Sequence, residues 1–342
     1  LVAILVLQLF ARSIVEVMGA RGELVEPALV YLRIRALAGP AVLLITAGHG
    51  VFRGWHDTRT PLAVSLLLNA VNLVLDPILI FVVGWGLAGA AVATVVAQWT
   101  GAACFLWLIL VRRREAMGVQ PRLPRPRDLL PFLHVGGTLV ARTFSLIGTL
   151  TLATAVATRV GTLAVAAHQV ASQLWLALAL VVDALAVAGQ AMVARYRGAR
   201  DGAAARIAAD RLLAWGLTVG LGLSAVFLAF SPWLPHLFTD DPAAIAAVRG
   251  LLPFVIAMQP LNALVFVWDG ILIGAEDFRY LAGQMVVSAA LAGVVLLLTL
   301  PLGWGLAGVW WGIVTLMLGR LVTLAARYWG IGMGAVPGGG RA

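Results

Sequence analysis

The stretch GVFRGWHDTR at residues 50–59 decides the fold, because it recurs as GILIGAEDFR at residues 270–279. Two glycines, an aspartate and an arginine keep their spacing in both copies, which are 220 residues apart. Pro40 and Pro260 keep the same offset, and the hexapeptide GWGLAG at 84–89 returns intact at 303–308, one residue out of register. These matches predict that the chain is built from two related halves.

The chain is too apolar to fold as a soluble protein. Of its 342 residues, 62% are hydrophobic and 11% are charged, whereas ordinary soluble domains are roughly 45–50% apolar and about 25% charged. Nine segments are apolar and long enough to cross a bilayer, and the segment 1–18 before them is shorter. The nine are 28–52, 61–83, 87–111, 128–156, 163–193, 208–230, 245–273, 278–301 and 305–328. We therefore predict an all-α polytopic membrane protein.

Arginine distribution predicts the orientation of these segments. The formal net charge is +9 and every basic residue is an arginine. Basic loops follow the segments 28–52, 87–111 and 163–193, and the positive-inside rule places such loops in the cytoplasm. Alternation then puts the arginine-free loops 84–86, 231–241 and 301–304 outside. We expect a multi-pass protein of the plasma membrane with a cytoplasmic C-terminus, and no binding of nucleic acid, because the charges lie in short loops between spans.

The repeat also predicts the organisation of the chain into lobes. Its two copies lie six crossings apart, so both halves enter the membrane in the same direction, as in parallel repeats. From residue 128 the second half has 132 residues before Pro260, whereas the first has 39 before Pro40. If the halves are equal, about 90 residues are missing, or two helices and part of a third at ~20 residues each. We expect a bundle of six plus six helices: a partial N-terminal lobe at 1–111, a cytoplasmic linker at 112–127 and a C-terminal lobe at 128–342 with a short cytoplasmic tail.

Several runs resemble transporters of the MATE (multidrug and toxic compound extrusion) family. YLRIRALAGP at 31–40, GVFRGWHDTRTPL at 50–62, NAVNLVLDPILIF at 69–81 and GLAGAAVATVVAQ at 86–98 are similar to the fourth to sixth helices of that family. Residues 139–175 and QPLNALVFVWDGILIGAEDFRY at 259–280 resemble its DinF-like branch. The resemblance implies a monomeric antiporter that exports organic cations, drugs or small organic metabolites in exchange for H⁺ or Na⁺. A flippase of lipid-linked saccharides, from the same superfamily, is the alternative.

Asp76 is the clearest functional candidate, because an ionisable side chain at membrane depth marks a pathway or a coupling site. It lies four residues after Asn72, so both side chains share one helical face, and the following Pro77 frees a backbone carbonyl. The resemblance implies that Asp76 and Asn72, together with Tyr31 and Thr94, form a site for H⁺ or Na⁺. The alternative is an aspartate near the outer helix end that is hydrogen-bonded and inert.

The second half has buried charges of its own. Arg142, Asp183 and Asp269 each lie near the middle of an apolar segment. Opposite charges that face the interior of a bundle can pair and offset part of their desolvation. We predict an Arg142–Asp183/Asp269 cluster that either binds an ionic group of the substrate or holds the lobe together.

Three further polar residues of the second half are candidates. His168 and Gln169 begin an apolar segment and can titrate or donate to a substrate, or form a satisfied interhelical hydrogen bond. Asn262 stands where the resemblance would place a cation-binding aspartate in other branches, so the substitution argues against a sodium site there. No HExxH, GxSxG or Walker A motif occurs and Cys104 is the sole cysteine. We therefore expect neither enzyme activity nor a cofactor beyond the coupling ion.

Overall fold

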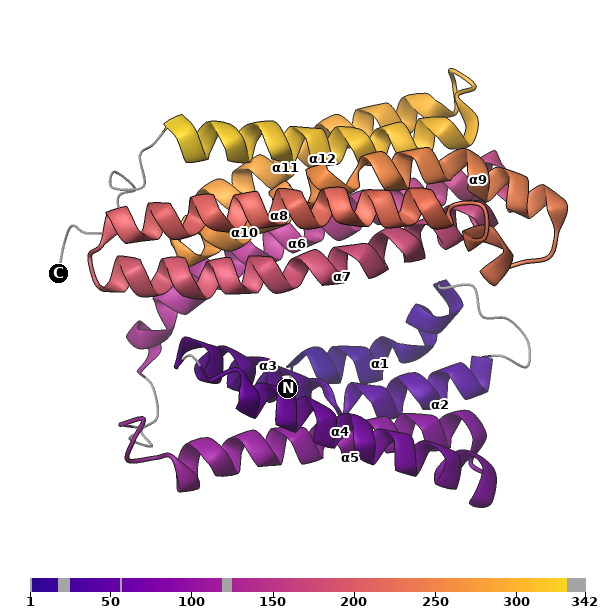
Figure 1. Ribbon diagram of the computed structural model, residues 1–342. Helices are drawn as coiled ribbons and strands as arrows, with labels where there is room; N and C mark the ends of the chain where they lie inside the picture. Colours follow the sequence, from indigo (N-terminus) through magenta and orange to yellow (C-terminus); the bar gives the residue numbers. More distant parts are fainter. Residues whose placement is uncertain (1, 18–24, 56, 119–124, 331–342) are drawn as a thin grey trace. The chain divides into compact units, whose positions relative to one another are not determined.

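The computed structural model describes residues 2–17, 25–55, 57–118 and 125–330. These residues form helices joined by short turns, and no strand occurs among them. The chain divides into two compact units, Leu1–Leu123 and Pro124–Ala342. The boundary falls within the predicted linker 112–127, of which residues 119–124 lie outside the described residues. Each unit is described separately below (Figure 1).

The first unit is built around a pair of helices, α4 and α5. Helix α5 also packs on α3 and α2, and α1 packs on α2. Both α4 and α5 end in a short π-helical segment, which widens the last turn of each. The bounds are α1 Val2–Val17, α2 Val25–Ala36, α3 Gly39–Gly54, α4 Arg59–Pro77 with the π-helical Ile78–Val82, and α5 Gly86–Trp107 with the π-helical Leu108–Arg112.

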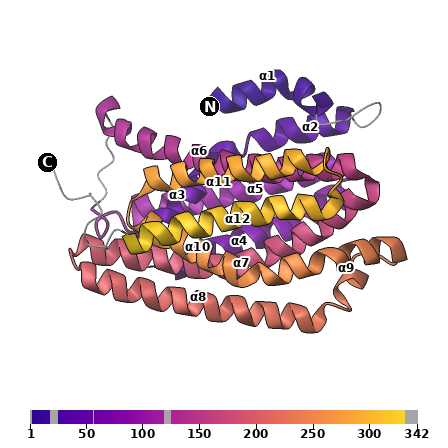
Figure 2. The same ribbon diagram turned by 90° about the horizontal axis from the view of Figure 1, so that it is seen from above.

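The second unit surrounds one central helix, α10, which packs on α7, α8 and α12 (Figure 2). Eleven of the 16 residues of α10 are buried, so this helix forms the core of the unit. Helices α6, α11 and α12 pack on one another beside it. The bounds are α6 Pro126–Val160, α7 Thr162–Gly198, α8 Gly202–Phe230, the 3₁₀ turn Leu234–Leu237, α9 Pro242–Ala257, α10 Gln259–Gly274, α11 Phe278–Thr299 and α12 Gly305–Gly330.

Two of the predicted segments are bent rather than straight. Segment 28–52 consists of α2 and α3 at 44° to each other, and segment 245–273 consists of α9 and α10 at 49°. Each second helix begins at the dipeptide that contains Pro40 or Pro260, because proline has no N–H to continue the preceding helix and is tolerated in a first turn. The two prolines that matched in the sequence therefore mark the same structural break in both units.

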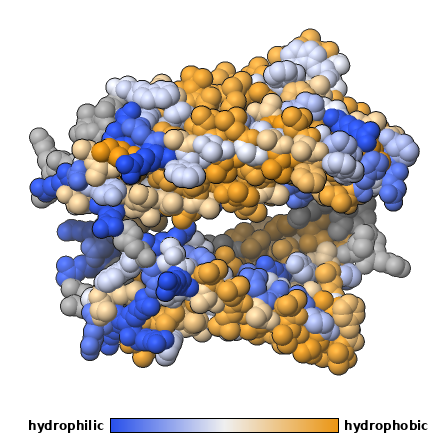
Figure 3. All heavy atoms as spheres, in the orientation of Figure 1, coloured by the Kyte–Doolittle hydropathy of each residue, from blue (hydrophilic) through white to orange (hydrophobic). Residues whose placement is uncertain are grey.

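The described helices contain seven unbroken candidate membrane spans, and nine if each bent pair counts as one. This confirms the predicted all-α polytopic fold and agrees with the nine expected full crossings. Large apolar side chains cover the flanks of the helices, with Phe81 and Phe144 both 79% exposed. Figure 3 displays them over the middle of the second unit, while hydrophilic residues gather where α7 turns into α8. Such a surface is suited to lipid rather than to water.

The repeated GWGLAG motif forms the same turn in both units. Gly84 and Gly86 have φ values of +76° and +52°, and Gly303 and Gly305 have +65° and +57°. These left-handed conformations favour glycine, because other residues meet a steric penalty there. The repeat of the motif is therefore explained by the turn that leads into α5 in one unit and into α12 in the other.

A further glycine of each motif allows two helices to approach closely. A Cβ on Gly89 would lie 2.7 Å from the carbonyl oxygen of Leu79, and one on Gly308 would lie 2.7 Å from Cγ2 of Thr299. Leu79 and Thr299 are themselves 220 residues apart. The internal repeat thus extends from single residues to the contacts between helices.

Candidate functional site

The site predicted in the first unit lies between α4 and α5. Asn72 Nδ2 of α4 donates a hydrogen bond to Thr94 Oγ1 of α5 at 3.5 Å. Thr94 Oγ1 in turn donates to the carbonyl of Ala90 at 2.8 Å. The structure thus brings together two of the four residues that the sequence singled out, and it does so at the tightest helix pair of the unit.

Asp76 lies one helical turn beyond Asn72 on the same face of α4. Its Oδ1 atom is buried and has no hydrogen-bond partner, and no ion pair within 4 Å joins Asp76 to another described residue. Pro77 follows directly, and the helix continues as the π-helical Ile78–Val82, a local widening that is frequent at functional sites. A carboxylate with a buried, unpartnered oxygen at membrane depth is costly, and a proton or a cation would offset that cost.

Tyr31 does not join this group through any hydrogen bond among the described residues. It is half-buried on α2. The polar link between α2 and α5 is made instead by Arg35, whose Nη1 donates to Gln98 Oε1 at 3.1 Å. Gln98 lies one turn after Thr94, so a row of polar side chains runs along α5. Both Arg35 and Gln98 are polar residues within apolar segments of the sequence.

The second unit contains a cluster of three buried ionic side chains. Arg142 Nη2 on α6 contacts Asp269 Oδ2 on α10 at 2.6 Å. Arg320 Nη2 on α12 donates to the same oxygen. Asp269 has a side-chain exposure of 6% and Arg320 one of 1%, whereas Arg142 is 18% exposed. The predicted contact between Arg142 and Asp269 is thus present in the structure.

Asp183 is not part of this cluster, and its predicted pairing with Arg142 was wrong. It lies on an exposed face of α7 and makes no ion pair with a described residue. Arg320 takes its place as the third member and was missed. The sequence does contain an indication that Arg320 is a buried charge, because it is a lone arginine inside the last apolar segment. Depth in the membrane alone does not decide which face of a helix a charge occupies.

The three charges do not balance. Two guanidinium groups share one carboxylate oxygen, which leaves a net charge of +1 on the cluster. Asp269 Oδ1, Arg142 Nε and Arg320 Nε are all buried without a hydrogen-bond partner. Arg320 is held further by Phe266, whose ring centroid lies 5.7 Å from its Cζ, and by Met317, whose sulfur accepts from Nη1 at 3.4 Å. The side chain of Arg320 is therefore fixed in place by contacts as well as by charge.

The remaining predicted residues lie in different settings. His168 is buried on α7, where Nε2 lies 3.3 Å from Thr154 Oγ1 and 3.4 Å from Ser172 Oγ, while its Nδ1 has no partner. Gln169 is exposed. Asn262 is 1% exposed, lies just after the break between α9 and α10, and leaves both side-chain amide atoms unpartnered. The contact with Thr154 is the interhelical hydrogen bond that we had considered for His168.

The two polar sites occupy positions that do not correspond in the repeat. At an offset of 220 residues, Asp76 matches Leu296, which is fully buried. Asp269 matches His49, whose Nε2 lies 3.4 Å from Ser65 Oγ. The two units share the repeated arrangement of their helices, but the polar side chains of the two sites lie at different positions of the repeat.

A repeated aspartate clamps the last helix of each unit. Asp57 accepts hydrogen bonds from the backbone N–H of Thr60 at 2.9 Å and from its hydroxyl at 2.7 Å, and it contacts Arg113 at 2.6 Å. These bonds, with the Thr60 N–H first, lower the pKa of Asp57 to about 2. Asp277 makes the corresponding contact with Arg327 at 2.7 Å. Both aspartates are structural rather than substrate-binding in this geometry.

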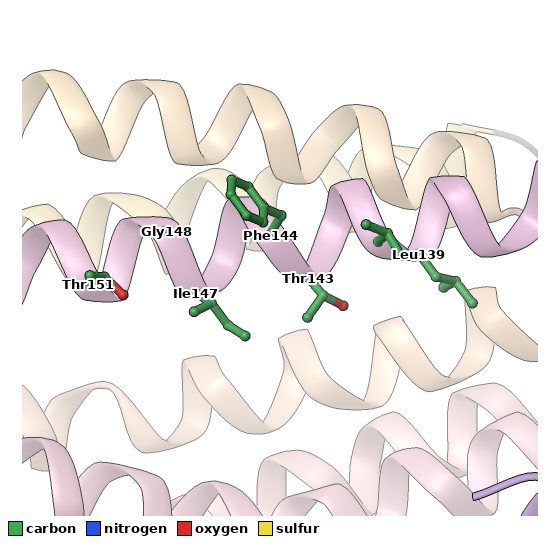
Figure 4. A pocket seen from close by; sticks show the side chains of 7 residues that line it. Leu139, Thr143, Phe144, Ile147, Gly148 and Thr151 are labelled. Carbon is green, nitrogen blue, oxygen red and sulfur yellow. The ribbon is translucent and has the colours of Figure 1, made fainter. Parts of the chain in front are cut away.

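The α6 helix also borders an apolar hollow in the second unit (Figure 4). None of its lining residues is ionisable, so the hollow suits hydrocarbon rather than charge. Leu139, which lies one helical turn before Arg142, is one of them. The lining consists of Leu139, Val140, Thr143, Phe144, Ile147, Gly148 and Thr151.

Fold and site together define a polytopic membrane protein made of two related helical units, each with polar groups at membrane depth. Comparison with known proteins gives the family: the MatE family model matches residues 1–78 and 140–299, and the chain belongs to the MATE family. The chain is 39% identical over 302 residues to Protein DETOXIFICATION 44, chloroplastic, of Arabidopsis thaliana, covering 88% of this chain and 57% of that protein. It is 31% identical over 257 residues to the multidrug resistance protein NorM of Burkholderia vietnamiensis, covering 71% and 54%.

Solved structures agree with this fold. A crystal structure of MATE in the bent conformation covers 94% of this chain and 72% of its own, with a TM-score of 0.79 and 23% identity. The chain spans about three fifths of the length of the curated relatives that it matches. Members of the family are membrane transporters, which are not enzymes.

Proposed function

We propose that this chain provides most of a secondary antiporter that exports organic cations, drugs or small organic metabolites in exchange for H⁺ or Na⁺. The observation that carries the proposal is Asp76, a carboxylate with an unpartnered buried oxygen beside the Asn72–Thr94 contact. The family match and the name of the NorM relative, a multidrug resistance protein, support the same reading. Assignment to the DinF-like branch stays a prediction.

Binding of a cation changes the charge that the first unit must bury. Without one, Asp76 places an uncompensated carboxylate at membrane depth; with a proton it is neutral, and with Na⁺ it is paired. Because a ligand shifts a conformational equilibrium only through its different affinity for the two states, this change in charge can favour one orientation of the lobes over the other. Oxygen atoms of Asp76, Asn72 and Thr94 are suitable ligands for Na⁺, since hard cations prefer oxygen.

We place this antiporter in the plasma membrane as a monomer, with the linker 112–127 and the C-terminus in the cytoplasm. The arginine-rich ends of α5 and α7 support that orientation through the positive-inside rule. Some curated relatives are named chloroplastic, so a fluorescent fusion is the direct test of location. Residues 331–342 of the predicted tail lie outside the described residues.

The test of this function is coupled transport by the full-length protein that contains this chain. Reconstituted into liposomes, it should move a labelled solute against its gradient when a pH or sodium gradient is imposed. Asp76→Asn should abolish the gradient-driven component, because the amide can neither titrate nor carry charge. Asp183→Asn is the matched control, since Asp183 is exposed and makes no ion pair with a described residue. Coupled transport at the wild-type rate in Asp76→Asn would refute the role given to Asp76.

One observation favours the lipid-linked saccharide flippase as a second candidate. The Arg142–Asp269–Arg320 cluster carries net positive charge, and a pyrophosphate-linked lipid needs a cationic cavity. Tight binding of a lipid pyrophosphate, with no transport of small solutes under either gradient, would favour the flippase over the antiporter.

A further inference from the structure

Helices α7 and α8 form a groove near the turn that joins them. The groove has a volume of about 350 Å³ and is lined by side chains of these two helices alone. It contains none of the residues of the two polar sites described above. Its polar groups include the phenol of Tyr196 on α7 and the guanidinium of Arg211 on α8, and its apolar surface includes Met192, Ile207, Leu212 and Trp215.

Arg211 carries a charge that no acidic side chain offsets. It is exposed, and it makes neither an ion pair nor a hydrogen bond with another described residue. The neighbouring Asp210 does not compensate it, because that carboxylate accepts from the hydroxyl of Tyr328 at 2.5 Å and contacts Arg206 Nε at 3.3 Å. The guanidinium of Arg211 is therefore available to an anion from outside the chain.

The position of Arg211 along α8 places its guanidinium near the surface of the bilayer. Helix α8 has 29 residues, or about 43 Å at 1.5 Å per residue, which matches a bilayer with its headgroup layers. Arg211 follows Gly202 by nine residues, so its Cα lies about 14 Å from that end of the helix. The Cβ atoms of a helix tilt toward its N-terminus, which is the same end, and arginine is long enough to snorkel outward. The guanidinium thus reaches the level of the lipid phosphates.

Tyr196 leans toward Arg211 from the other helix. A short turn joins α7 to α8, and the two helices run antiparallel, with a Cβ on Gly189 lying 3.6 Å from Cδ1 of Leu212. The same tilt of the Cβ atoms therefore directs Tyr196 away from the turn and Arg211 toward it. A hydroxyl and a guanidinium converge on one groove, and both are donors that suit the oxygens of a phosphate.

The turn between α7 and α8 adds positive charge around the groove. Residues 195–211 contain five arginines and two aspartates, which gives a formal net charge of +3. Both aspartates have partners, because Asp201 caps α8 by accepting from the N–H of Ala204 at 2.9 Å and Asp210 is held by Tyr328. Figure 3 shows this hydrophilic end beside the apolar flank of the helices. Each arginine at such a position strengthens the binding of anionic lipid about fivefold.

We propose that this groove binds an anionic phospholipid of the leaflet at the arginine-rich end of the second unit. The lipid phosphate accepts from Arg211 and Tyr196, and an acyl chain packs on the apolar lining. Ile207 and Trp215 are 55% and 64% exposed, so lipid reaches the groove without a rearrangement of the helices. A soluble anion would use the arginine but leave the apolar lining uncovered. The site goes beyond the proposed antiport, because it does not depend on which solute is moved.

The test is lipid binding to the purified full-length protein that contains this chain, measured by native mass spectrometry. The probes are phosphatidylglycerol, phosphatidylcholine and glycerol 3-phosphate, which carries a phosphate but no acyl chain. Wild type should bind phosphatidylglycerol at least fivefold more tightly than phosphatidylcholine, and glycerol 3-phosphate more weakly than either lipid. Arg211→Gln should weaken the binding of phosphatidylglycerol at least tenfold, because it removes charge-assisted hydrogen bonds to the phosphate. Arg211→Lys, which keeps the charge, should restore part of the affinity.

Arg195→Gln is the matched control, because Arg195 is an exposed arginine of the same basic end but does not line the groove. It should lose about fivefold or less, which is the contribution of one surface charge. Ala204→Phe fills the groove without changing the charge and should also weaken the binding of phosphatidylglycerol. Equal losses in Arg195→Gln and Arg211→Gln would mean diffuse attraction to the whole basic surface and would overturn the proposal. So would equal binding of the two lipids, or glycerol 3-phosphate that binds as tightly as phosphatidylglycerol.

A melting measurement provides a second readout. Phosphatidylglycerol should raise the apparent melting temperature of wild type and of Arg195→Gln, because a ligand that binds only the folded state stabilises it. It should have little effect on Arg211→Gln, whose folding is checked by size-exclusion chromatography. Asp76→Asn should respond as the wild type does, since Asp76 belongs to the other unit. An equal rise in Arg211→Gln and wild type would refute the assignment of the lipid to this groove.

Discussion

Replacing Gly270 by alanine should destabilise the second unit, because α10 and α7 touch there through their backbones. A Cβ built on Gly270 lies 2.1 Å from the carbonyl oxygen of Ala186 and 2.7 Å from its carbonyl carbon. Ordinary contact begins at 3.4 Å, so α10 would have to move by about 1.3 Å from a helix that it packs against along much of its length. Both atoms belong to the backbone of Ala186, so neither can turn away as the end of a flexible side chain could.

Such overpacking costs about 1–3 kcal/mol. That corresponds to roughly a 5- to 150-fold fall in the ratio of folded to unfolded protein. For a unit of about this size, the melting temperature should fall by roughly 2–12 °C, at 2–4 °C per kcal/mol. The measurement is the apparent melting temperature in detergent, determined by size-exclusion chromatography of samples heated to a series of temperatures.

The internal repeat supplies the control, Gly50→Ala. Gly50 occupies the same position in the first copy of the motif, but no atom lies within 4 Å of its would-be Cβ. Alanine is favoured over glycine inside a helix by about 0.5–1 kcal/mol, so this variant should match or slightly exceed wild type. Equal melting temperatures for Gly270→Ala and Gly50→Ala would refute the close packing of α10 on α7.

Four other variants test the structure. Because the pKa of Asp57 is lowered from 3.8 to about 2, its carboxylate should stabilise the protein fully above pH 4 and lose that effect as the pH falls to about 2. The melting temperatures of wild type and Asp57→Asn, measured across pH 2–6, should therefore converge at the acid end. A constant difference between them would contradict this. Asp269→Leu should lower the free energy of unfolding by about 3–5 kcal/mol, because it leaves two buried arginines without a counter-charge. Arg320→Met leaves the neutral pair of Arg142 and Asp269, so it should lower the melting temperature less in the same assay. The reverse order would mean that the cluster does not carry an excess of positive charge. Gly89→Ala should lower the melting temperature, because its Cβ would lie 2.7 Å from the carbonyl oxygen of Leu79, and an unchanged value would argue against that approach.

Much of the fold could be predicted from the sequence, because the same residues mark the same structural features in both copies of the repeat. Pro40 and Pro260 matched at a constant offset, and each marks the break in a bent helix pair. Glycines of the two GWGLAG copies matched because each turn needs left-handed φ values. Helical spacing placed Asn72 and Asp76 on one face, and the structure adds the contact from Asn72 to Thr94. Helix breaks, glycine turns and shared helix faces depend on residues close together in the sequence, so they can be predicted from it.

The composition of the charged cluster could not be derived in the same way. Depth in an apolar segment identified Asp183 and Asp269 equally, but only Asp269 faces the interior. Which face of a long apolar helix turns inward depends on the rotation of that helix against its neighbours, and α7 is apolar nearly all round. Arg320 was missed for a related reason: its partner, Asp269, lies 51 residues away, and their contact depends on how α10 packs on α12.

Substrate counterflow compared with gradient-driven accumulation tests the central claim most directly. In liposomes that contain the full-length protein, Asp76→Asn should still exchange labelled for unlabelled solute across the membrane, because exchange needs the binding site and the moving lobes but no coupling ion. The same variant should fail to accumulate solute under an imposed pH or sodium gradient. Accumulation at the wild-type level would contradict the account, because the coupling cation would then bind somewhere other than beside Asp76.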